Sequence, residues 1–422
     1  MQDKRAEADA ILRRAAWRLV PLILIMYIAS FLNRVNVGFA ALTMNQDLGF
    51  TPEIYGLGAG VFFWGYFLFE VPSNLIMEKV GARLWISRIM LTWAVISAAN
   101  AFVQGAYSFY VVRFLLGVAE AGFYPGVLLY FTYWFPSATR ARILAIFCAG
   151  VPLANVVGSP LSGWLLGLSA HGLSGWQWMY LLEAIPTFGL GLLALKYLPD
   201  NPARAGWLSP REKELVLARL AQDERPAVHG FGEMLGDWRV WALIVPDFCI
   251  VFGIYALGFW MPQMVKAMGY SIRETSLIVM IPYIASLAIL WGLGVSSDRT
   301  GKRALHYSIS ALICAAGYVI AAWGTGHNWL VIFGFCLAAG GAYSGLSTFW
   351  TVPPIFLGGT AAAGAFALIN STGNLSGFVG PGMMGWLLQL TGDYRAGLWM
   401  CVAVLLVGAA SMQLLSSSFH RK

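Results

Sequence analysis

The chain has 422 residues, of which 59% are hydrophobic and only 11% are charged. Soluble proteins carry about 25% charged residues, so this composition excludes an ordinary water-exposed surface and predicts a membrane protein. The net charge of +7 does not indicate nucleic-acid binding, because the basic residues lie between long apolar segments.

Long apolar segments predict the membrane-spanning helices. A spanning helix needs roughly 20 mostly apolar residues. Twelve segments meet this requirement, and they cover residues 17–38, 54–77, 83–104, 107–131, 141–168, 177–198, 240–264, 273–296, 304–324, 328–350, 362–390 and 395–416. We therefore expect an all-α membrane protein with twelve transmembrane helices.

Charged residues between the spans predict the orientation. Most Lys and Arg residues lie at the two termini, in the 199–239 segment, and in the loops at 78–88, 140–142 and 299–303. The alternate loops hold only Lys266, Arg273 and Arg395. Since basic loops stay on the cytoplasmic side, we predict a multi-pass protein with both termini in the cytoplasm. The N-terminus lacks the cleavage site of a signal peptide.

The segment between the sixth and seventh spans is the only long polar stretch. Ser209 and Glu212 have the spacing of a capping box, with Pro210 at the first helical position. A short amphipathic helix at the cytoplasmic surface and a flexible linker with a nascent helix both fit this pattern.

An internal repeat divides the chain into two halves. Residues 78–83 (Glu-Lys-Val-Gly-Ala-Arg) return about 220 positions later as residues 298–303 (Asp-Arg-Thr-Gly-Lys-Arg). We therefore predict a six-helix bundle over 1–198, a cytoplasmic linker over 199–239 and a second six-helix bundle over 240–422.

The repeated charges lie at predicted helix ends on the cytoplasmic side. We expect them to pair with neighbouring helix termini in one conformation and to release in another, as conformational gating loops. A signal for membrane orientation alone is the other interpretation. The residues concerned are Glu78, Lys79, Arg83, Asp298, Arg299 and Arg303.

Three of the charged residues within predicted spans are candidates for function, because charges there are costly and usually functional. Arg34 lies near the outer end of the first span, while Arg113 and Glu120 share one face of the fourth. A guanidinium suits a substrate carboxylate. A carboxylate in poorly solvated surroundings can bind a proton, which makes Glu120 a candidate proton carrier. An internal ion pair that only fixes helix packing is the other interpretation.

Further polar residues lie within the spans. We interpret the acids Glu70, Glu183 and Asp247 as structural. In the second half, uncharged residues could contact a hydroxylated or carboxylated ligand, or could link neighbouring helices. These residues are Tyr255, Trp260, Gln263, Ser347, Trp350, Asn370 and Asn374.

Motifs of enzymes and metal proteins are missing from the sequence. There is no HExxH, GxSxG or Walker motif. The five histidines are scattered, and the five cysteines have no paired spacing. We therefore predict neither an enzyme nor a cofactor or metal site.

Several strings resemble one family of membrane transporters. Gly294 together with residues 298–303 resembles the signature loop of the major facilitator superfamily, and residues 74–83 resemble a degraded copy. Within the superfamily, four strings resemble the anion:cation symporter family: Asn33 to Ala40, Gly65 to Asn74, Arg113 to Gly126 and Leu198 to Asp200.

This resemblance implies uptake of a small organic acid anion with protons by alternating access, across the bacterial cytoplasmic membrane. Sugar acids, dicarboxylates and aromatic carboxylates are the implied substrate classes. It implies that Glu120 carries a proton with Arg113 as its interacting cation. The predicted substrate-binding residues are Arg34, Tyr66, Gln263, Ser347, Trp350 and Asn370.

One position departs from the family pattern. Asp usually precedes the arginine of the first span, and here that position is Asn33, which cannot titrate. We include Asn33 with Glu120 and Arg113 among the proton-coupling positions. Three outcomes are open: Glu120 couples protons alone, coupling is altered, or Asn33 arrests the cycle.

We predict a monomeric secondary transporter whose partners are an organic anion, protons and the lipid bilayer, with no nucleic acid. An uncoupled anion facilitator or exchanger of the same fold is the alternative, because Asn33 replaces the usual Asp. A ligand sensor and a membrane enzyme are further alternatives, which the sequence supports less because it contains no signalling domain and no catalytic constellation.

Overall fold

The computed structural model describes residues 2–222, 236–353 and 359–419. These residues are helical apart from turns and one isolated β-bridge between Ala170 and Leu173. The first half contains α1 (Gln2–Val35), α2 (Val37–Asp47), α3 (Pro52–Val80), α4 (Ala82–Ala99), α5 (Ala106–Glu120), α6 (Phe123–Trp134), α7 (Ser137–Leu165) and α8 (Gly175–Tyr197). The second half contains α11 (Trp238–Ala267), α12 (Ile272–Thr300), α13 (Arg303–Trp323), α14 (Asn328–Phe349), α15 (Gly359–Asn374), α16 (Ser376–Thr391) and α17 (Arg395–Phe419).

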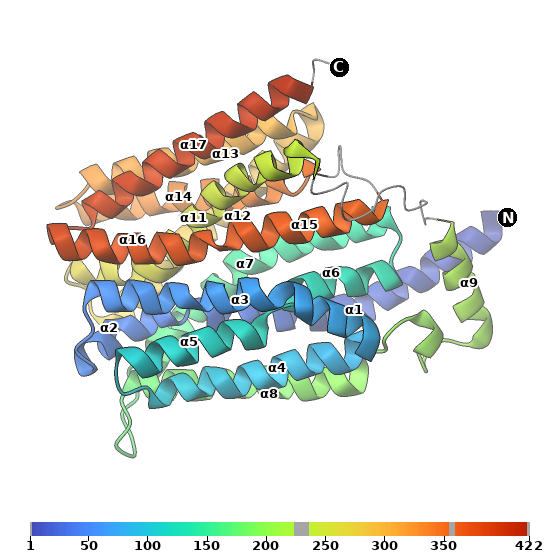
Figure 1. Ribbon diagram of the computed structural model, residues 1–422, viewed down its shortest axis with the longest axis horizontal. Helices are drawn as coiled ribbons and strands as arrows, with labels where there is room; N and C mark the ends of the chain where they lie inside the picture. The colour runs from blue at the N-terminus through green and yellow to red at the C-terminus, as the bar shows by residue number, and fades with distance from the viewer. Residues whose placement is uncertain (1, 223–235, 354–358, 420–422) are drawn as a thin grey trace.

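The helices run roughly parallel in two groups that meet along α3, α7, α12 and α16 (Figure 1). Helices of the first half lie in the lower part of the view, and helices of the second half lie in the upper part. Both termini lie at the same end of the molecule, together with α9 (Pro210–Ala221). Any deep site between the halves is therefore built from residues far apart in sequence.

Ten helical segments among the described residues are long and apolar enough to cross a membrane. They correspond to ten of the twelve predicted spans, and α7 and the pair α15–α16 cover the other two. Helices are favoured because backbone polar groups in lipid must be satisfied within the segment. The predicted fold class is confirmed.

The first span is longer than predicted. The sequence criterion ended it at residue 38, but the apolar helical segment runs from Arg5 to Asp47. The polar residues near Asn36 suggested the end of the span in the sequence. In the structure the helix continues as α2, and most of α2 is buried. The expectation that Arg34 lies near the outer end of the first span is therefore wrong. Arg34 lies thirteen residues before Asp47, about 20 Å along a helix, and so at mid-depth.

Three spans are interrupted near residues that hydrogen bonds link to one another, namely Arg34, Glu120, Tyr255 and Asn374. Asn36 separates α1 from α2, Ala121 and Gly122 separate α5 from α6, and Leu375 separates α15 from α16. Gly122 has φ of 85°, a left-handed conformation that glycine adopts without strain. Interrupted helices in transporters expose backbone polar groups only where a cavity or other protein surrounds them.

Close contacts join the two halves toward the end away from the termini. Backbone oxygens of α16 and α3 leave no room for a Cβ at Gly56 or at Gly385. Gly38 of α2 lies against Gly258 of α11 in the same way. Small residues let helices approach closely in lipid, so these glycines make a tight seam.

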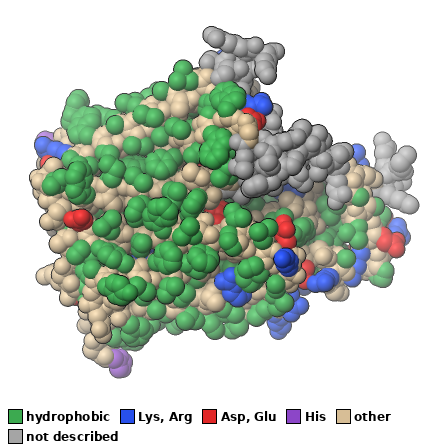
Figure 2. Space-filling view, in the orientation of Figure 1, with side chains coloured by type: hydrophobic (Ala, Val, Ile, Leu, Met, Phe, Trp, Pro, Cys, Tyr) green, Lys and Arg blue, Asp and Glu red, His purple; other side chains and the backbone are tan. Residues whose placement is uncertain are grey.

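The polar segment after α8 forms the predicted helix, α9. The capping box is present: Ser209 Oγ accepts from Glu212 N at 3.3 Å, and Glu212 Oε2 accepts from Ser209 N at 2.8 Å. Three ion pairs join α9 to the start of α1: Arg14–Glu212, Arg211–Glu7 and Arg219–Asp9. Figure 2 shows hydrophobic side chains over the middle of the molecule and many charges toward this end.

Candidate functional site

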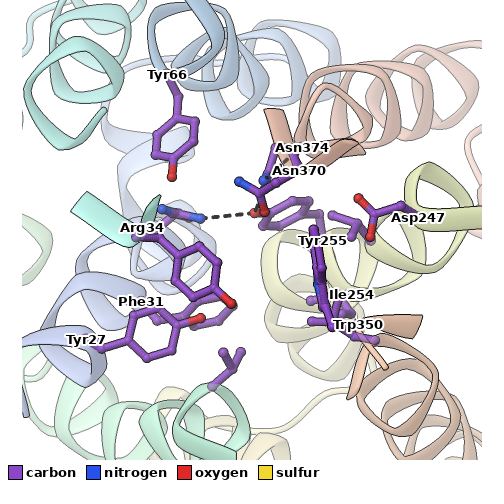
Figure 3. A pocket seen from close by; sticks show the side chains of 14 residues that line it. Tyr27, Phe31, Arg34, Tyr66, Asp247, Ile254, Tyr255, Trp350, Asn370 and Asn374 are labelled. Carbon is purple, nitrogen blue, oxygen red and sulfur yellow. Dashed lines mark hydrogen bonds between the residues drawn. The ribbon is translucent and has the colours of Figure 1, made fainter. Parts of the chain in front are cut away.

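A pocket lies between the two halves at the level of the interrupted helices. Its empty space is about 650 Å³, counted together with its opening. In Figure 3, Arg34, Tyr66, Phe31 and Tyr27 face Tyr255, Asn370, Asn374, Asp247 and Trp350 from the opposite half. The remaining lining residues are Tyr124, Val151, Val251, Ile254 and Leu346.

Arg34 projects from the first half into this pocket. Its side chain is 10% exposed. It donates two hydrogen bonds to Oε1 of Glu120, and Nη1 donates to the hydroxyl of Tyr255 at 3.1 Å. The guanidinium also lies 5.1 Å from the ring centroid of Tyr66 and 5.3 Å from that of Phe62. One cation thus connects the two halves across the pocket.

Glu120 is fully buried at the end of α5, next to the break before α6. Its Oε1 accepts from Arg34 and, at 2.9 Å, from Ser30 Oγ. Within the described structure, Oε2 has no hydrogen-bond partner. A proton on Oε2 would weaken the hold on Arg34 without removing an existing hydrogen bond of that oxygen.

Arg113 does not pair with Glu120, contrary to the expectation from the fourth span. The helix α5 ends at Glu120, and Arg34 of α1 donates hydrogen bonds to the Glu120 carboxylate. Arg113 is fully buried, and its Nη2 donates to the backbone oxygen of Ala59 at 3.2 Å. Its guanidinium lies 5.3 Å from the centroid of Phe62. Arg34 lies at the same distance from this ring, so Phe62 contacts both cations.

The second half contributes hydrogen-bonding groups and an aromatic surface to the pocket. Tyr255 Oη donates to Asn374 Oδ1 at 2.7 Å, and Asn374 Nδ2 donates to the backbone oxygen of Asn370 at 2.8 Å. Trp350 follows α14 directly and lines the pocket. Asn370 and Trp350 are predicted site residues, whereas Tyr255 and Asn374 entered the prediction only as general polar candidates.

Asn33 points away from the pocket. Its Nδ2 donates to Thr187 Oγ1 of α8 at 2.9 Å, and its Oδ1 accepts from Ser97 Oγ of α4 at 2.9 Å. Nearby, Glu183 accepts from Asn36 Nδ2 at 2.8 Å and from Ser162 Oγ at 2.7 Å. These contacts hold helices of the first half together.

Gln263 and Ser347 are not among the residues that line the pocket. Gln263 Oε1 accepts from Asn45 Nδ2 of α2 at 3.3 Å, toward the end away from the termini. Ser347 lies on α14 one turn before Trp350. Two acids that the sequence analysis interpreted as structural lie at or beside the pocket. Asp247 lines it, and Glu70 accepts a hydrogen bond from the lining residue Asn370.

The two repeated loops differ in their contacts. After α3, Gly81 has φ of 99°, and the carboxylate of Asp200 accepts from Arg83 N at 2.9 Å, which caps the start of α4. In the second half, Asp298 pairs with Arg303 at 2.5 Å. The carboxylate at the start of α4 therefore comes from Asp200 and not from Glu78. The gating role of the two loops stays a prediction.

Tyr27 and Tyr124 line the pocket but were not predicted. Tyr27, Phe31 and Arg34 have the spacing i, i+4, i+7, which puts them on one face of α1. That periodicity could have identified Tyr27. Tyr124 follows the break after Glu120, so helical spacing from Glu120 gives no guide to its direction.

A buried pocket between two helical halves, with an ion pair at mid-depth, defines the class of a secondary membrane transporter. The sequence matches the model of the Major Facilitator Superfamily over residues 23–381, and the chain belongs to this superfamily. Its helical architecture is similar to that of a solved bacterial homologue of the human lysosomal transporter Spinster (TM-score 0.76, 17% identity, 95% of this chain and 97% of that chain).

Two curated relatives are close in sequence. A protein of Agrobacterium vitis named "Putative tartrate transporter" is 46% identical over 97% of this chain and 92% of its own length. A protein of Pseudomonas putida named "Putative metabolite transport protein NicT" is 43% identical over 94% of this chain and 92% of its own length. These relatives agree with the predicted anion:cation symporter family, and the prediction of a transporter and not an enzyme is confirmed.

Proposed function

We propose that this protein takes up a small organic acid anion together with protons by alternating access. The observation that carries the proposal is that Arg34, on the wall of a pocket between the halves, pairs with the buried Glu120. The name of the Agrobacterium vitis relative supports a carboxylated substrate such as tartrate. A sugar acid, a dicarboxylate and an aromatic carboxylate all remain within the proposed class.

The geometry explains how a proton and an anion would bind together. With Glu120 ionised, its carboxylate occupies the hydrogen-bond donors of Arg34 that a substrate carboxylate would need. A proton on Glu120 removes that competition and leaves Arg34 free for the anion. For one substrate carboxylate, the buried charge is then the same as before, one cation and one anion, so no charge is left uncompensated. Each ligand therefore favours binding of the other.

The second half would recognise the rest of the substrate. Asn370, Asn374 and Tyr255 offer amide and hydroxyl groups, and Trp350 offers an aromatic surface. These groups suit hydroxyl or ring substituents of an organic acid. Because Arg34 reaches Tyr255 across the pocket, the substrate would contact both halves and could bias their relative position.

Alternating access accounts for the uneven contact between the halves. Tight contacts lie toward the end away from the termini, at Gly56–Pro381 and Gly163–Ser276. We propose that the described conformation opens toward the end that carries the termini, and that this end is cytoplasmic because of its basic loops. We also propose that the protein acts as a monomer in the bacterial inner membrane.

Proton-driven uptake into liposomes tests this function. The purified protein would be reconstituted and given an inward proton gradient with tartrate, a sugar acid or an aromatic carboxylate outside. The proposal predicts accumulation of one of these anions above its external concentration, and equilibration only when the gradient is collapsed. Equilibration without accumulation under both conditions would instead favour an uncoupled facilitator or exchanger, the alternative that Asn33 suggests.

A further inference from the structure

Glu70 is a buried carboxyl group where α3 meets α15, apart from the Arg34–Glu120 pair. Its side chain is fully buried, and Oε1 accepts a hydrogen bond of 3.1 Å from Asn370 Nδ2. In the part of the chain that the structure describes, Oε2 has no hydrogen-bond partner. A buried carboxylate is costly unless a cation or several donors compensate it, and a single amide compensates it weakly.

None of the charged groups near Glu70 forms an ion pair with its carboxylate in the described structure. The charge of Arg34 acts on Glu70, but the hydrogen bonds that Arg34 donates go to Glu120 and Tyr255. On α4, Arg88 lies over the ring of Trp85 at 3.9 Å. The described parts of α15 and α16 contain no charged residue. The titratable or charged side chains on these elements that also belong to the pocket or to the pair beside it are Tyr66 on α3, Glu120 and Arg113 on α5, and Tyr124 on α6.

Asn370 connects Glu70 to the pocket. Its side chain lines the pocket, and its amide is the donor that Glu70 uses. An anion that accepts a hydrogen bond from Asn370 Nδ2 would take the donor away from Glu70. It would also bring a second negative charge to the same side of the pocket. Both changes favour the neutral form of Glu70.

We propose that Glu70 is a second proton-binding residue, which takes up a proton when an anion in the pocket engages Asn370. A proton from water binds the carboxylate of Glu70, while Asn370 Nδ2 turns its hydrogen bond to the anion. When the anion leaves, the proton dissociates and Asn370 donates to Glu70 Oε1 again. This inference rests on the proposed function and adds one proton per anion to that of Glu120.

Proton uptake on mixing with tartrate tests the inference. The purified protein would be mixed with tartrate in weakly buffered detergent solution, and the pH change would be recorded with a soluble indicator. Glu70→Gln should take up about one proton fewer per bound anion than the parent. Glu183→Gln is the matched control, because Glu183 is also a buried acid with neutral donors but lies away from the pocket. Equal proton uptake by Glu70→Gln and the parent would overturn the inference.

The same series separates this inference from the proposed function. A loss in Glu120→Gln with no loss in Glu70→Gln would leave the proposed function intact and remove only the second proton site. No proton uptake by the parent while tartrate binds would contradict both.

Infrared spectroscopy of the anion-free protein gives a test that does not need tartrate to bind. A pH titration should show the band of a protonated carboxyl group that is missing in Glu70→Gln and present in Glu183→Gln. In Asn370→Ala this band should persist to higher pH, because the ionised form loses its donor. Spectra of Glu70→Gln that match the parent over the whole titration would overturn the inference.

Discussion

The two halves of the pocket differ in chemistry although both are built from long apolar helices. The first half places a guanidinium and a carboxylate in mid-membrane, Arg34 and Glu120. The second half faces them with amides, a phenol and an indole, and its single acid on the wall is Asp247. In the proposed function, charge compensation and proton exchange thus belong mainly to one half, and recognition of the remaining substrate surface belongs to the other.

Replacing Arg34 should have the largest effect. Arg34→Ala removes the donors that would bind a carboxylate, and we expect anion affinity to fall roughly a hundredfold, from about 3 kcal/mol of charged hydrogen bonds. Binding of tartrate or another stabilising anion would be measured by calorimetry. Affinity equal to the parent would contradict the role of Arg34.

Two controls accompany this change. Arg34→Ala leaves Glu120 buried without its cation, which costs about 3–5 kcal/mol of stability. The double variant Arg34→Ala with Glu120→Gln removes that charge, so it should regain stability without regaining affinity. Arg34→Lys keeps the charge but cannot donate two parallel hydrogen bonds, and should bind with intermediate affinity.

A glycine on α16 tests the contact between the halves. A Cβ at Gly385 would meet the backbone oxygen of Pro52, so Gly385→Ala should favour opening of that end. An overpacking cost of about 1–3 kcal/mol shifts a two-state equilibrium roughly tenfold. Gly382→Ala is the control on the same helix, because its Cβ would make only an ordinary contact of 3.7 Å with Leu57.

Labelling reports this shift. A single cysteine introduced at Asn45, beside the closed end, should react several-fold faster with a water-soluble reagent in Gly385→Ala than in Gly382→Ala. Identical rates in the two variants would show that these contacts do not control access.

Removing the hydroxyl of Tyr255 tests whether the second half recognises the substrate. Tyr255→Phe removes the hydrogen bonds to Arg34 and Asn374, and should weaken anion binding about fivefold, for about 1 kcal/mol. Tyr318→Phe is the matched control, since Tyr318 donates to the backbone of Gly253 and does not line the pocket. If both variants bind equally well, the second half does not recognise the substrate through this hydroxyl.

The smallest effect is expected outside the membrane. The backbone of Ser209 and the guanidinium of Arg14 hold the pKa of Glu212 below its usual value. This stabilisation is present above the ordinary glutamate pKa and is lost as the pH falls through the lowered pKa. Glu212→Gln should therefore lower the Tm slightly at neutral pH and not at acidic pH. Glu214→Gln, on the same helix without an ion pair in the described structure, should not change the Tm.

Apolar length and charge distribution were sufficient to predict the fold from sequence. Each span is buried in lipid or protein over about 20 residues, so its local composition carries the signal. The interruptions at Asn36 and Leu375 were not predicted, because neither residue is a strong helix breaker. The true depth of Arg34 depended on the continuation of the first span into α2.

The pocket could be predicted only in part. Arg34 and Glu120 are evident because charges within spans are rare. Their mutual pairing was missed, since the family resemblance implied Arg113 as the cation that interacts with Glu120 and the observed partner lies 86 positions away. The importance of Glu70 also depends on a contact 300 positions away, with Asn370, which no local pattern encodes.

Proton coupling through Glu120 is the central claim, and Glu120→Gln in liposomes tests it most directly. A glutamine mimics the protonated acid, so this variant should still exchange labelled anion for unlabelled anion across the membrane. It should fail to accumulate anion when an inward proton gradient is imposed. Accumulation equal to that of the parent would contradict the account.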